Sequence, residues 1–576
     1  MTDTVETDRA EETVPPWAAG TENRMHELDP ELSEGEIATV CGYGETVRFA
    51  DGDWLWRTGD RDAGFFLVLD GEVEIVNVRG AEEHVIITHG RGHYGGEIST
   101  MTGRGAMVGG RAKGDVEAIA LEGTALREML ALEPELGEKV LLSFILRRMR
   151  MIAETQGDVT LYGVEAESET GNLRSFLSRH GIPFHFVDAE SEEGRAQMRG
   201  LDADPADRPV VATDRGVLRH PGIRELAEHL EIAAEIEDGA RFDVVILGGG
   251  PAGLAAAVYG ASEGLSALVI EACAPGGQAA TSSRIENFFG FPTGISGQAL
   301  TGRGFLQAHK FGAEIAPARS VERLECGPSL RDAPHRIVLD GGDTVEAGAV
   351  VIATGAIYRE PPIENLDRFT GGGVHYGASH IEAQLCRDRE VAIVGGGNSA
   401  GQAAIFLSGH AKCVRIMVRG DGLGHSMSSY LIDRIERTAN IEVMTHTEVQ
   451  EAKGDTKLES LVLLNNGTGE TQEMPISQLF IFIGAVPATD FLPDAVTMDD
   501  KGFVVTGPDL SRDALEAAGW PLDRAPSHLE TSCPGIFAVG DVRASSVKRV
   551  ASAVGEGSVC IQFVHRVLAD REEAAA

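Results

Sequence analysis

Short runs in which apolar and polar residues alternate fill residues 26–155. The stretch GFFLVLDGEVEIV at 64–76 is representative, because its β-branched and aromatic residues indicate strands and its Asp70-Gly71 pair is expected to form a turn. An amphipathic stretch at 135–154 then predicts a long helix. This pattern favours a β-rich domain that ends in a helix.

Strand-like and helix-like runs alternate in the next part of the chain, residues 157–236. The order predicts a small α/β domain, followed by the polar linker EIEDGA. The expected strands are DVTLYGV, PFHFVD and RPVVATD, and the expected helices are GNLRSFLSRHG and HPGIRELAEHL.

The first of two glycine-rich turns lies in FDVVILGGGPAGLAAAVYG, where an apolar strand precedes the turn and a small-residue helix follows it. Gly248, Gly250 and Gly253 match the G-x-G-x-x-G pattern, which lets the backbone approach a pyrophosphate at a helix N-terminus. The next predicted strand ends in Glu271, where a carboxylate can accept a ribose hydroxyl. Together these features predict a dinucleotide site.

The second glycine-rich turn lies in VAIVGGGNSAGQAAIFL, where Gly395, Gly397 and Ala400 form the G-x-G-x-x-A variant. The following strand, VRIMVRGDG, leads to Arg419 at the place where an acidic residue would select NAD. An arginine there can pair with the 2′-phosphate of NADP, or it can be a solvated strand end. The two turns are too far apart for one nucleotide domain, so we expect two.

Charge and cysteine content narrow the class of function. The 576 residues carry 50 Lys+Arg against 89 Asp+Glu, a net charge of −39, which disfavours nucleic acid and anionic lipid as partners. Seven cysteines are scattered without a CxxC pair or metal-ligand spacing, so we expect a reducing cytoplasm and no metal. Residues 1–25 are polar and acidic, which predicts a disordered tail and no signal peptide. The uncharged stretch 244–262 is long enough for a membrane span, but it contains the first glycine turn and its helix, so we expect no span there.

Six short motifs identify a family. GGGPAG, GGQ, IEN, ATG, GGGNSA and GIFAVGD, in this order, resemble the thioredoxin reductase branch of the pyridine-nucleotide flavoproteins. The resemblance covers about 241–570 and implies a multidomain α/β fold with two Rossmann-like domains. It places an FAD domain at 241–362 and 485–576, with an NAD(P) domain inserted at 363–484.

The resemblance also implies which residues hold the cofactors, FAD and NADP (or NAD). In the second FAD segment Asp541 is expected to end a strand, and a helix is expected to begin near Arg549, where its N-terminus would stabilise charge on a reduced flavin. The FAD residues implied are Gly248, Gly250, Pro251, Ala252, Gly253, Glu271, Gly277, Gln278, Asn287, Thr354, Gly355, Gly540, Asp541, Lys548, Arg549 and Val550, and the NAD(P) residues are Gly395, Gly397, Asn398, Ser399, Ala400 and Arg419.

Two departures from the family stand out. The family's NADP pattern has three arginines where this chain has VRGDGLGHS, with only Arg419 retained. The family's redox CxxC is also missing, since VHYGASHIEAQLC at 374–386 contains only Cys386, which is expected to be a buried thiol. No catalytic acid or base stands out there, although His375, His380 and Glu382 are candidate proton carriers.

The two front domains resemble known modules. Residues 26–156 resemble a cyclic-nucleotide-binding β-roll, with Gly96 and Glu97 where the family holds the ribose and Arg104 near the place of the phosphate arginine. Gly105, Gly109 and Gly110 depart from the nucleotide-binding pattern of that family. The alternative is therefore a domain that no longer binds a cyclic nucleotide and serves for interaction or dimerisation. Residues 157–240 resemble a glutaredoxin or thioredoxin domain with Pro209 as its cis-proline, but VEAESETGNLRSFL lacks the CxxC.

The sequence therefore predicts an FAD-dependent oxidoreductase that takes hydride from NAD(P)H. The acceptor is not a disulfide or is unknown, with a small ferredoxin-like protein or a quinone as candidates, and the β-roll is a candidate regulator. A redox-sensing flavoprotein with little turnover is the alternative. Disulfide reduction that uses an external dithiol is a third hypothesis. We expect a homodimer with the 135–154 helix as a contact.

Overall fold

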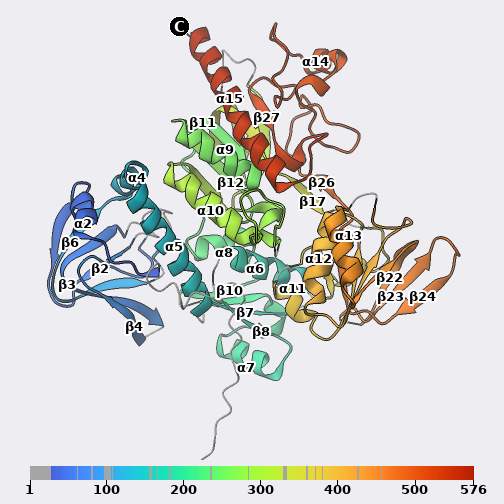
Figure 1. Cartoon of the computed structure of the whole chain (residues 1–576), viewed down its shortest axis with the longest axis horizontal. Coiled ribbons are helices and arrows are strands. Elements are labelled where there is room, and N and C mark those ends of the chain that lie inside the picture. The colour runs from blue at the N-terminus through green and yellow to red at the C-terminus, as the bar shows by residue number, and fades with distance from the viewer. Residues whose placement is uncertain are drawn as a thin grey trace, which may run out of the picture. The chain divides into compact units, whose positions relative to one another are not determined.

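In its described residues, the computed structural model contains six β-sheets with flanking helices (Figure 1). It describes residues 28–575 except 61–62, 80–81, 97–104, 107, 155–158, 165–166, 181, 183, 214, 234–235, 283, 328–333, 359–360, 370–371, 379, 425–426 and 456. The chain divides into two units, residues 1–158 with 181–183, and the remainder. The expected tail at 1–25 lies outside the described residues. Within the described ranges, no helix has the length and apolarity to cross a membrane.

The first unit is a β-roll. Its six-stranded sheet has the order β1-β6-β3-β4, with β2 paired to β6 and β5 to β3. Apolar residues of the strands and of the three helices share one core, for example Phe65, Met129 and Phe144. The elements are β1 (Glu45–Phe49), β2 (Trp54–Trp56), β3 (Phe65–Arg79), β4 (Glu82–His89), β5 (Tyr94–Gly95), β6 (Gly109–Leu121), α2 (Glu34–Cys41), α4 (Gly123–Leu132) and α5 (Pro134–Glu154).

The turn expected at Asp70-Gly71 is wrong, because β3 runs through this pair without reversing. The register against β6 shifts on both sides of Asp70, so the pair forms a bulge instead. Gly71 has a φ of +87°, and a Cβ at this position would lie 2.4 Å from the Asp115 carbonyl oxygen. A positive φ and close packing, which also occur in turns, thus explain the glycine.

The small α/β part has a four-stranded sheet with the order β10-β9-β7-β8, in which only β7 and β8 are parallel. The Arg208-Pro209 peptide is cis, as expected for Pro209. The likeness of this part to a thioredoxin fold stays a prediction. Its elements are β7 (Val159–Gly163), β8 (Phe184–Asp188), β9 (Val210–Thr213), β10 (Gly216–Arg219), α6 (Ser168–Arg179), α7 (Glu192–Gly200), α8 (Ile223–His229) and η2 (Pro205–Asp207).

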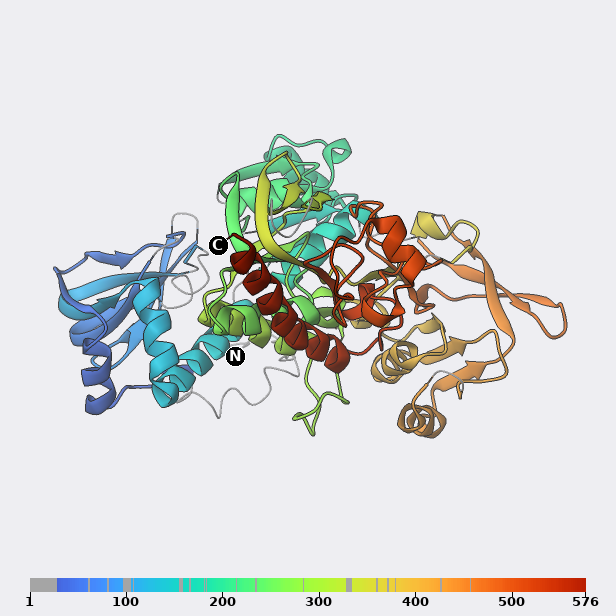
Figure 2. The ribbon, with the colours of Figure 1, turned by 90° about the horizontal axis from the view of Figure 1, so that it is seen from above.

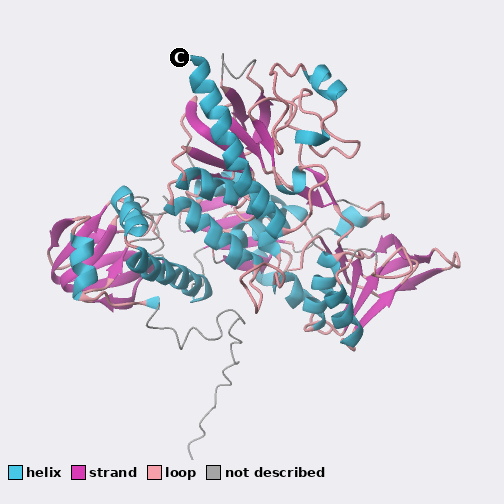
Figure 3. Cartoon of the chain, turned by 45° about the horizontal axis from the view of Figure 1, so that its top comes forward, coloured by secondary structure: helices cyan, strands magenta, loops and turns pink. Residues whose placement is uncertain are grey.

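The seven-stranded sheet has the order β13-β12-β11-β16-β15-β14, and β27 pairs with β16. Side chains alternate along β11, so that Val244 and Ile246 pack under the helices and Val245 and Leu247 face the other core. Helices α9, α10 and α15 cover the first face (Figure 3). The elements are β11 (Ala240–Leu247), β12 (Ala267–Glu271), β13 (Glu314–Pro317), β14 (Val321–Glu325), β15 (His335–Leu339), β16 (Thr344–Ile352), β27 (Ile536–Ala538), α9 (Pro251–Ser262), α10 (Gly297–Lys310), α14 (Arg512–Ala518) and α15 (Val550–Ala575).

A parallel five-stranded sheet, β18-β25-β19-β20-β21, forms the second nucleotide-binding-like part. The three-stranded sheet β22-β23-β24, the extended orange ribbon in Figure 2, packs on it through Leu461 and Leu463. The pair β17 (Ala356–Tyr358) and β26 (Ala485–Pro487) lies where the chain enters and leaves this part. The elements are β18 (Val374–His375), β19 (Glu390–Val394), β20 (Cys413–Met417), β21 (Ile441–Met444), β22 (Thr447–Lys453), β23 (Ser460–Asn465), β24 (Thr471–Met474), β25 (Gln478–Ile481), α11 (His380–Leu385), α12 (Asn398–Ser408) and α13 (Ser429–Arg437).

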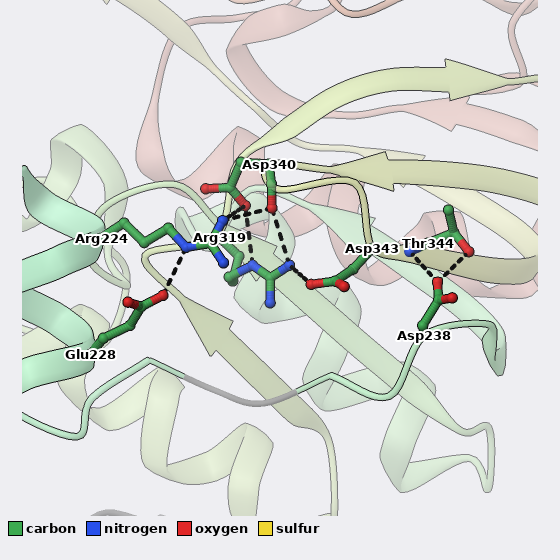
Figure 4. Close-up of polar contacts among 7 residues, drawn as sticks. All are labelled: Arg224, Glu228, Asp238, Arg319, Asp340, Asp343 and Thr344. Atoms are coloured by element: carbon green, nitrogen blue, oxygen red, sulfur yellow. Dashed lines mark hydrogen bonds and ion pairs between the residues drawn. The ribbon is translucent and has the colours of Figure 1, made fainter.

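The small α/β part packs against the seven-stranded sheet through a polar cluster (Figure 4). Arg319, only 6% exposed in its side chain, pairs with Asp340 at 3.1 Å and with Asp343 at 2.7 Å. Arg224 of α8 donates to the Asp340 carbonyl oxygen at 2.7 Å and pairs with Glu228 of its own helix at 2.9 Å. In the linker, Asp238 accepts hydrogen bonds from the backbone and hydroxyl groups of Thr344, both at 2.9 Å.

Candidate nucleotide-binding sites

The first glycine turn joins the C-terminal end of β11 to α9. Gly248 has a φ of +108°, and a Cβ there would lie 2.4 Å from the carbonyl oxygen of Ala353. A Cβ on Gly253 would lie 1.9 Å from the Gly248 carbonyl oxygen. Internal packing therefore requires both glycines, whatever binds outside.

Gly250 differs from these two, because the nearest described atom to a Cβ there would be the Gly277 Cα at 3.8 Å. Gly250 is the N-cap of α9, a helix of 12 residues that begins at Pro251. The open space lies beside a helix N-terminus, where backbone N–H groups favour negative charge. This space suits a pyrophosphate.

Glu271, the last residue of β12, places its carboxylate against the same turn. It accepts hydrogen bonds from the backbone N–H groups of Gly249 at 2.7 Å and Cys273 at 3.0 Å. Because β11 and β12 are adjacent and parallel, their C-terminal ends meet at one edge of the sheet. The carboxylate therefore lies at this edge of the sheet beside the first glycine turn, and its contact with a ribose hydroxyl stays a prediction.

The GGQ and ATG motifs border this turn. Gly277 has a φ of +54°, and a Cβ there would lie 2.9 Å from the Gly250 Cα, so two backbones approach closely. Gln278 donates from its side-chain amide to the Ala356 carbonyl oxygen, next to Gly355. Thr354 follows β16 and donates its hydroxyl proton to the Ala488 carbonyl oxygen at 2.8 Å.

The segment after β27 completes this group. Gly540 has a φ of +73°, and a Cβ there would lie 3.0 Å from the Ala252 Cβ of α9. Asp541 does not end a strand as expected, because β27 ends at Ala538 and Asp541 lies in the short 3₁₀ helix η6 (Gly540–Val542). Burial raises the pKa of the Asp541 carboxyl, and the nearby Lys548 opposes that shift.

Glu556 and Arg543, which the sequence analysis did not single out, hold this segment together with the predicted Lys548. Glu556 of α15 accepts a hydrogen bond from the Gly540 N–H at 2.7 Å and pairs with Arg543 at 2.6 Å. Lys548 donates to the Asp541 carbonyl oxygen just before α15 begins at Val550. The Glu556 contact joins groups 16 residues apart, and no local sequence pattern signals it.

The predicted FAD residues thus fall into a connected set around the end of β11. Asn287 differs, since it is exposed in the loop after η3 (Gly277–Thr281), and among the described residues no hydrogen bond or ion pair joins it to the other predicted FAD residues. Its neighbour Glu286 forms an ion pair at 2.6 Å with Arg434 of α13, which links the two nucleotide-binding-like parts. That ion pair was also not predicted, because it joins residues 148 positions apart.

The second glycine turn joins β19 to α12. Gly395 has a φ of +144°, and a Cβ there would lie 2.3 Å from the Phe482 carbonyl oxygen, whereas no described atom lies within 4 Å of a Cβ on Gly397. Asn398 accepts a hydrogen bond from the Ser428 N–H at 2.7 Å. Ser399 is exposed at the first turn of α12 and Ala400 is buried under it. The open position again lies at a helix N-terminus.

Arg419 lies two residues beyond the end of β20, the neighbour of β19, and is exposed. The same loop holds Asp421, which pairs with His446 at 3.2 Å, and Gly420, whose carbonyl oxygen accepts a hydrogen bond from the His446 N–H at 3.2 Å. Arg419 therefore lies just beyond the strand next to the one that leads into the second glycine turn, with an acidic residue two positions away, and its pairing with a nucleotide stays a prediction.

The stretch 374–386 has a structural core role in its described part. His375 is 9% exposed, its Nε2 lies 2.7 Å from Gln478 Oε1, and its ring packs 4.8 Å from that of Phe480. Burial raises the pKa of the Cys386 thiol to about 12, so the thiolate needed for a nucleophile is not formed near neutral pH. His380 and Glu382 lie on α11.

In the β-roll, Gly96 has a φ of +81° and a Cβ there would lie 2.0 Å from the Gly64 carbonyl oxygen. Glu97 and Arg104 lie outside the described residues. A Cβ on Gly110 would lie 2.4 Å from the Trp56 ring, and Gly109 packs in the same way on Trp54. Gly109 and Gly110, which are among the glycines that depart from the cyclic-nucleotide-binding pattern, are therefore required by tryptophan packing.

Two segments of the chain match known protein families. Residues 242–557 match the pyridine nucleotide-disulphide oxidoreductase family, and residues 46–133 match the cyclic nucleotide-binding domain. A thioredoxin reductase of Listeria innocua is 32% identical over 335 residues, which cover 58% of this chain and 96% of the relative. A thioredoxin reductase of Treponema pallidum is 35% identical over 318 residues, covering 55% and 94%.

The chain is also similar to solved structures of thioredoxin reductases. Thioredoxin reductase from Lactococcus lactis, in a crystal structure of its FR conformation, has 30% identity and a TM-score of 0.51, covering 57% of this chain and 99% of that one. The enzyme from T. acidophilum has 28% identity and a TM-score of 0.50, covering 57% and 98%. The multidomain α/β fold with a β-rich front domain is confirmed. The chain belongs to the pyridine nucleotide-disulphide oxidoreductase family, with thioredoxin reductases as homologues and a cyclic-nucleotide-binding domain in front.

Proposed function

We propose that this protein is an FAD-dependent oxidoreductase that accepts hydride from NADPH or NADH and delivers electrons to an acceptor other than a protein disulfide. One observation carries the proposal. Each of the two glycine turns keeps a glycine, Gly250 or Gly397, whose Cβ side is open at a helix N-terminus. Since packing does not explain these two glycines, close approach of a pyrophosphate does.

The chain's residues fit FAD at the first turn. The Gly250 space would receive the pyrophosphate, Glu271 the ribose, and the segments around Gly277, Thr354 and Gly540 would line the remainder. Bound FAD would supply the hydride and electron transfer. The 26-residue helix α15, which begins at Val550 after Lys548, would direct its N-terminal N–H groups at negative charge on the bound flavin. The proposed FAD domain comprises 241–362 and 485–576.

The second turn would hold the dinucleotide substrate. Gly397 would face its pyrophosphate, and Arg419 would pair with the 2′-phosphate of NADP. The proposed NAD(P) domain is 363–484, inserted between the two FAD segments, with 157–240 and 26–156 as the domains in front.

The shortage of cysteines in the stretch 374–386 supports an acceptor other than a disulfide. The 374–386 stretch has the single cysteine Cys386, whose pKa of about 12 leaves it protonated, so an internal dithiol relay has no donor. A small redox protein or a quinone would take electrons from flavin directly. The N-terminal β-roll would regulate this activity by binding a cyclic nucleotide or by forming a dimer. We further propose that the protein works in the cytoplasm.

Anaerobic reduction of the purified flavoprotein tests the proposal. We expect NADPH or NADH to bleach the flavin rapidly in the natural protein, and Gly397→Ala to slow bleaching at least tenfold. Gly409→Ala is the matched control, because it changes the other end of α12, where a Cβ makes an ordinary contact of 3.5 Å. Failure of both dinucleotides to bleach the flavin would refute the proposal.

The flavin site has its own test. Gly250→Ala should fold yet be purified with much less flavin, since its Cβ meets no described atom closer than 3.8 Å. Gly302→Ala in α10, where no described atom lies within 4 Å of the added Cβ, should keep the natural flavin content. Equal flavin content in both variants would contradict the assignment of the first turn.

The alternative function is a redox sensor that binds both cofactors but turns over slowly. It is favoured by the loss of cysteines at both places where the family resemblances expect a CxxC, 374–386 and the start of α6. Steady-state turnover with a quinone and with ferredoxin separates the two. Rapid flavin bleaching without turnover on either acceptor, or on thioredoxin, would favour the sensor.

A further inference from the structure

Two cysteines from distant parts of the chain meet in the seven-stranded sheet. Cys326 follows the end of β14, and Cys533 lies three residues before β27. Their Sγ atoms are 3.0 Å apart, and both thiols are free. A disulfide requires about 2.05 Å between sulfurs, so a movement of about 1 Å would join them.

The two thiols differ in access and in acidity. Cys326 is half-buried, whereas Cys533 is 4% exposed. A hydrogen bond joins the two sulfurs, and it lowers the pKa of Cys326 and raises that of Cys533. Cys326 is therefore the thiol that a dissolved oxidant reaches and the one that forms a thiolate more readily.

The pair lies far from the first glycine turn. Glu325, next to Cys326, pairs with Arg336 of β15, which in turn pairs with Glu346 early in β16. The first glycine turn follows Leu247, which pairs with Ile352 at the other end of β16. Glu346 and Ile352 are six residues apart along β16. At 3.3 Å per residue, the cysteine pair is therefore about 20 Å from the first glycine turn along the strand direction. The pair therefore does not replace the missing CxxC relay beside the flavin.

We propose that Cys326 and Cys533 are a redox-modification site that a low-molecular-weight disulfide oxidises to an intramolecular disulfide. The Cys326 thiolate attacks one sulfur of the small disulfide, whose S–S bond breaks and releases one thiolate. Cys533 loses its proton and attacks the Cys326 sulfur of the mixed disulfide, which releases the second thiolate. The protein loses two electrons and two protons, and the small disulfide gains them as two thiols.

The new bond would fasten together two segments of one sheet. Cys326 and Cys533 are 207 positions apart, and the five-stranded sheet lies wholly between them in sequence. β27 is held through its pairing with β16 at Val350–Ile352 and leads directly to Gly540. A crosslink across so long a loop restricts the unfolded chain strongly, so oxidation should stabilise this sheet and the segment that follows β27.

The test uses the purified full-length protein with oxidised glutathione as the oxidant. Each cysteine lies in a tryptic peptide that has no other cysteine, 324–331 for Cys326 and 525–543 for Cys533. We expect the two peptides to appear joined in unreduced digests, and denatured protein to show five free thiols in place of seven. Thermal unfolding should shift upward by about 5 °C.

Three variants sharpen the test. Cys533→Ser should accumulate a single glutathione adduct on Cys326, and Cys326→Ser should leave Cys533 unmodified. Cys41→Ser, which removes an exposed cysteine of the first unit, should form the crosslink as the natural protein does. Absence of the joined peptides, with glutathione only on Cys41 or on Cys326 of the natural protein, would overturn the proposal. A crosslink that leaves thermal unfolding unchanged would overturn its stabilising role, and neither outcome depends on flavin chemistry.

Discussion

Replacing Asp29 by asparagine should destabilise the β-roll in a strongly pH-dependent way. The Asp29 carboxylate lies 2.8 Å from the Arg147 guanidinium and 3.1 Å from His89, with its side chain only 12% exposed. Arg147, on α5, also donates to the carbonyl oxygens of Leu28 and Tyr94. Asp29 therefore holds the start of the described chain against the helix and the sheet.

The size of the effect follows from the pKa. Burial by itself would raise the pKa of Asp29, but the hydrogen bond to His89 and the charges of His89 and Arg147 lower it from 3.8 to about 2. A difference of this size between folded and unfolded chains corresponds to about 2.5 kcal/mol of stability. Because the folded pKa is the lower one, this stabilisation is complete above about pH 5, falls to about half at pH 3, and is lost as the pH falls through 2.

Urea denaturation followed by tryptophan fluorescence measures this, since Trp54 and Trp56 of β2 lie in the same unit. At pH 7, Asp29→Asn should lower the free energy of unfolding by about 2.5 kcal/mol. Glu117→Gln is the control, because its partner Arg48 is 80% exposed and such surface pairs contribute less than about 1 kcal/mol. A deficit for Asp29→Asn that is as large at pH 3 as at pH 7 would refute the electrostatic origin.

Three further substitutions test the sheet and the sites. Glu530→Gln should lower the free energy of unfolding by about 3–5 kcal/mol in thermal or urea unfolding, because the fully buried Glu530 carboxylate pairs with Arg524 at 2.6 Å and accepts hydrogen bonds from two backbone N–H groups. Glu271→Gln should weaken flavin binding about tenfold or more, measured by ultrafiltration, since a charged acceptor for a ribose hydroxyl is lost. Arg419→Ala should raise the KM for NADPH and leave that for NADH unchanged; equal changes in both would make Arg419 a solvated strand end.

The glycine turns could be predicted because their requirements are local. At Gly248 and Gly395 the positive φ and the neighbouring carbonyl oxygen fix the residue type, and both features follow from a strand that turns directly into a helix. Glu271 could be placed for the same reason, because adjacent parallel strands end at one edge. The sequence did not separate Gly250 and Gly397, whose Cβ sides are open, from the glycines that internal packing requires.

Contacts between distant segments could not be predicted in this way. The Glu556 contact with Gly540, the Glu286–Arg434 ion pair and the Cys326–Cys533 pair all depend on how sheets and helices pack, which no spacing along the chain encodes. The bulge at Gly71 shows the same limit, since a glycine after an aspartate fits both a turn and a bulge until the pairing of β3 with β6 is known.

The small α/β part packs against the loop that follows Glu271 through hydrogen bonds to backbone carbonyl oxygens. Its α6 carries no cysteine, yet Arg179 at the end of that helix donates to the Ala274 carbonyl oxygen, and His180 Nε2 lies 3.0 Å from the Cys273 carbonyl oxygen. Cys273 in turn donates its N–H to Glu271. On the other side, Arg224 contacts Asp340 (Figure 4). These contacts join the small α/β part to the loop that follows Glu271 and to the seven-stranded sheet, so packing alone gives this part a structural role beside the proposed flavin site.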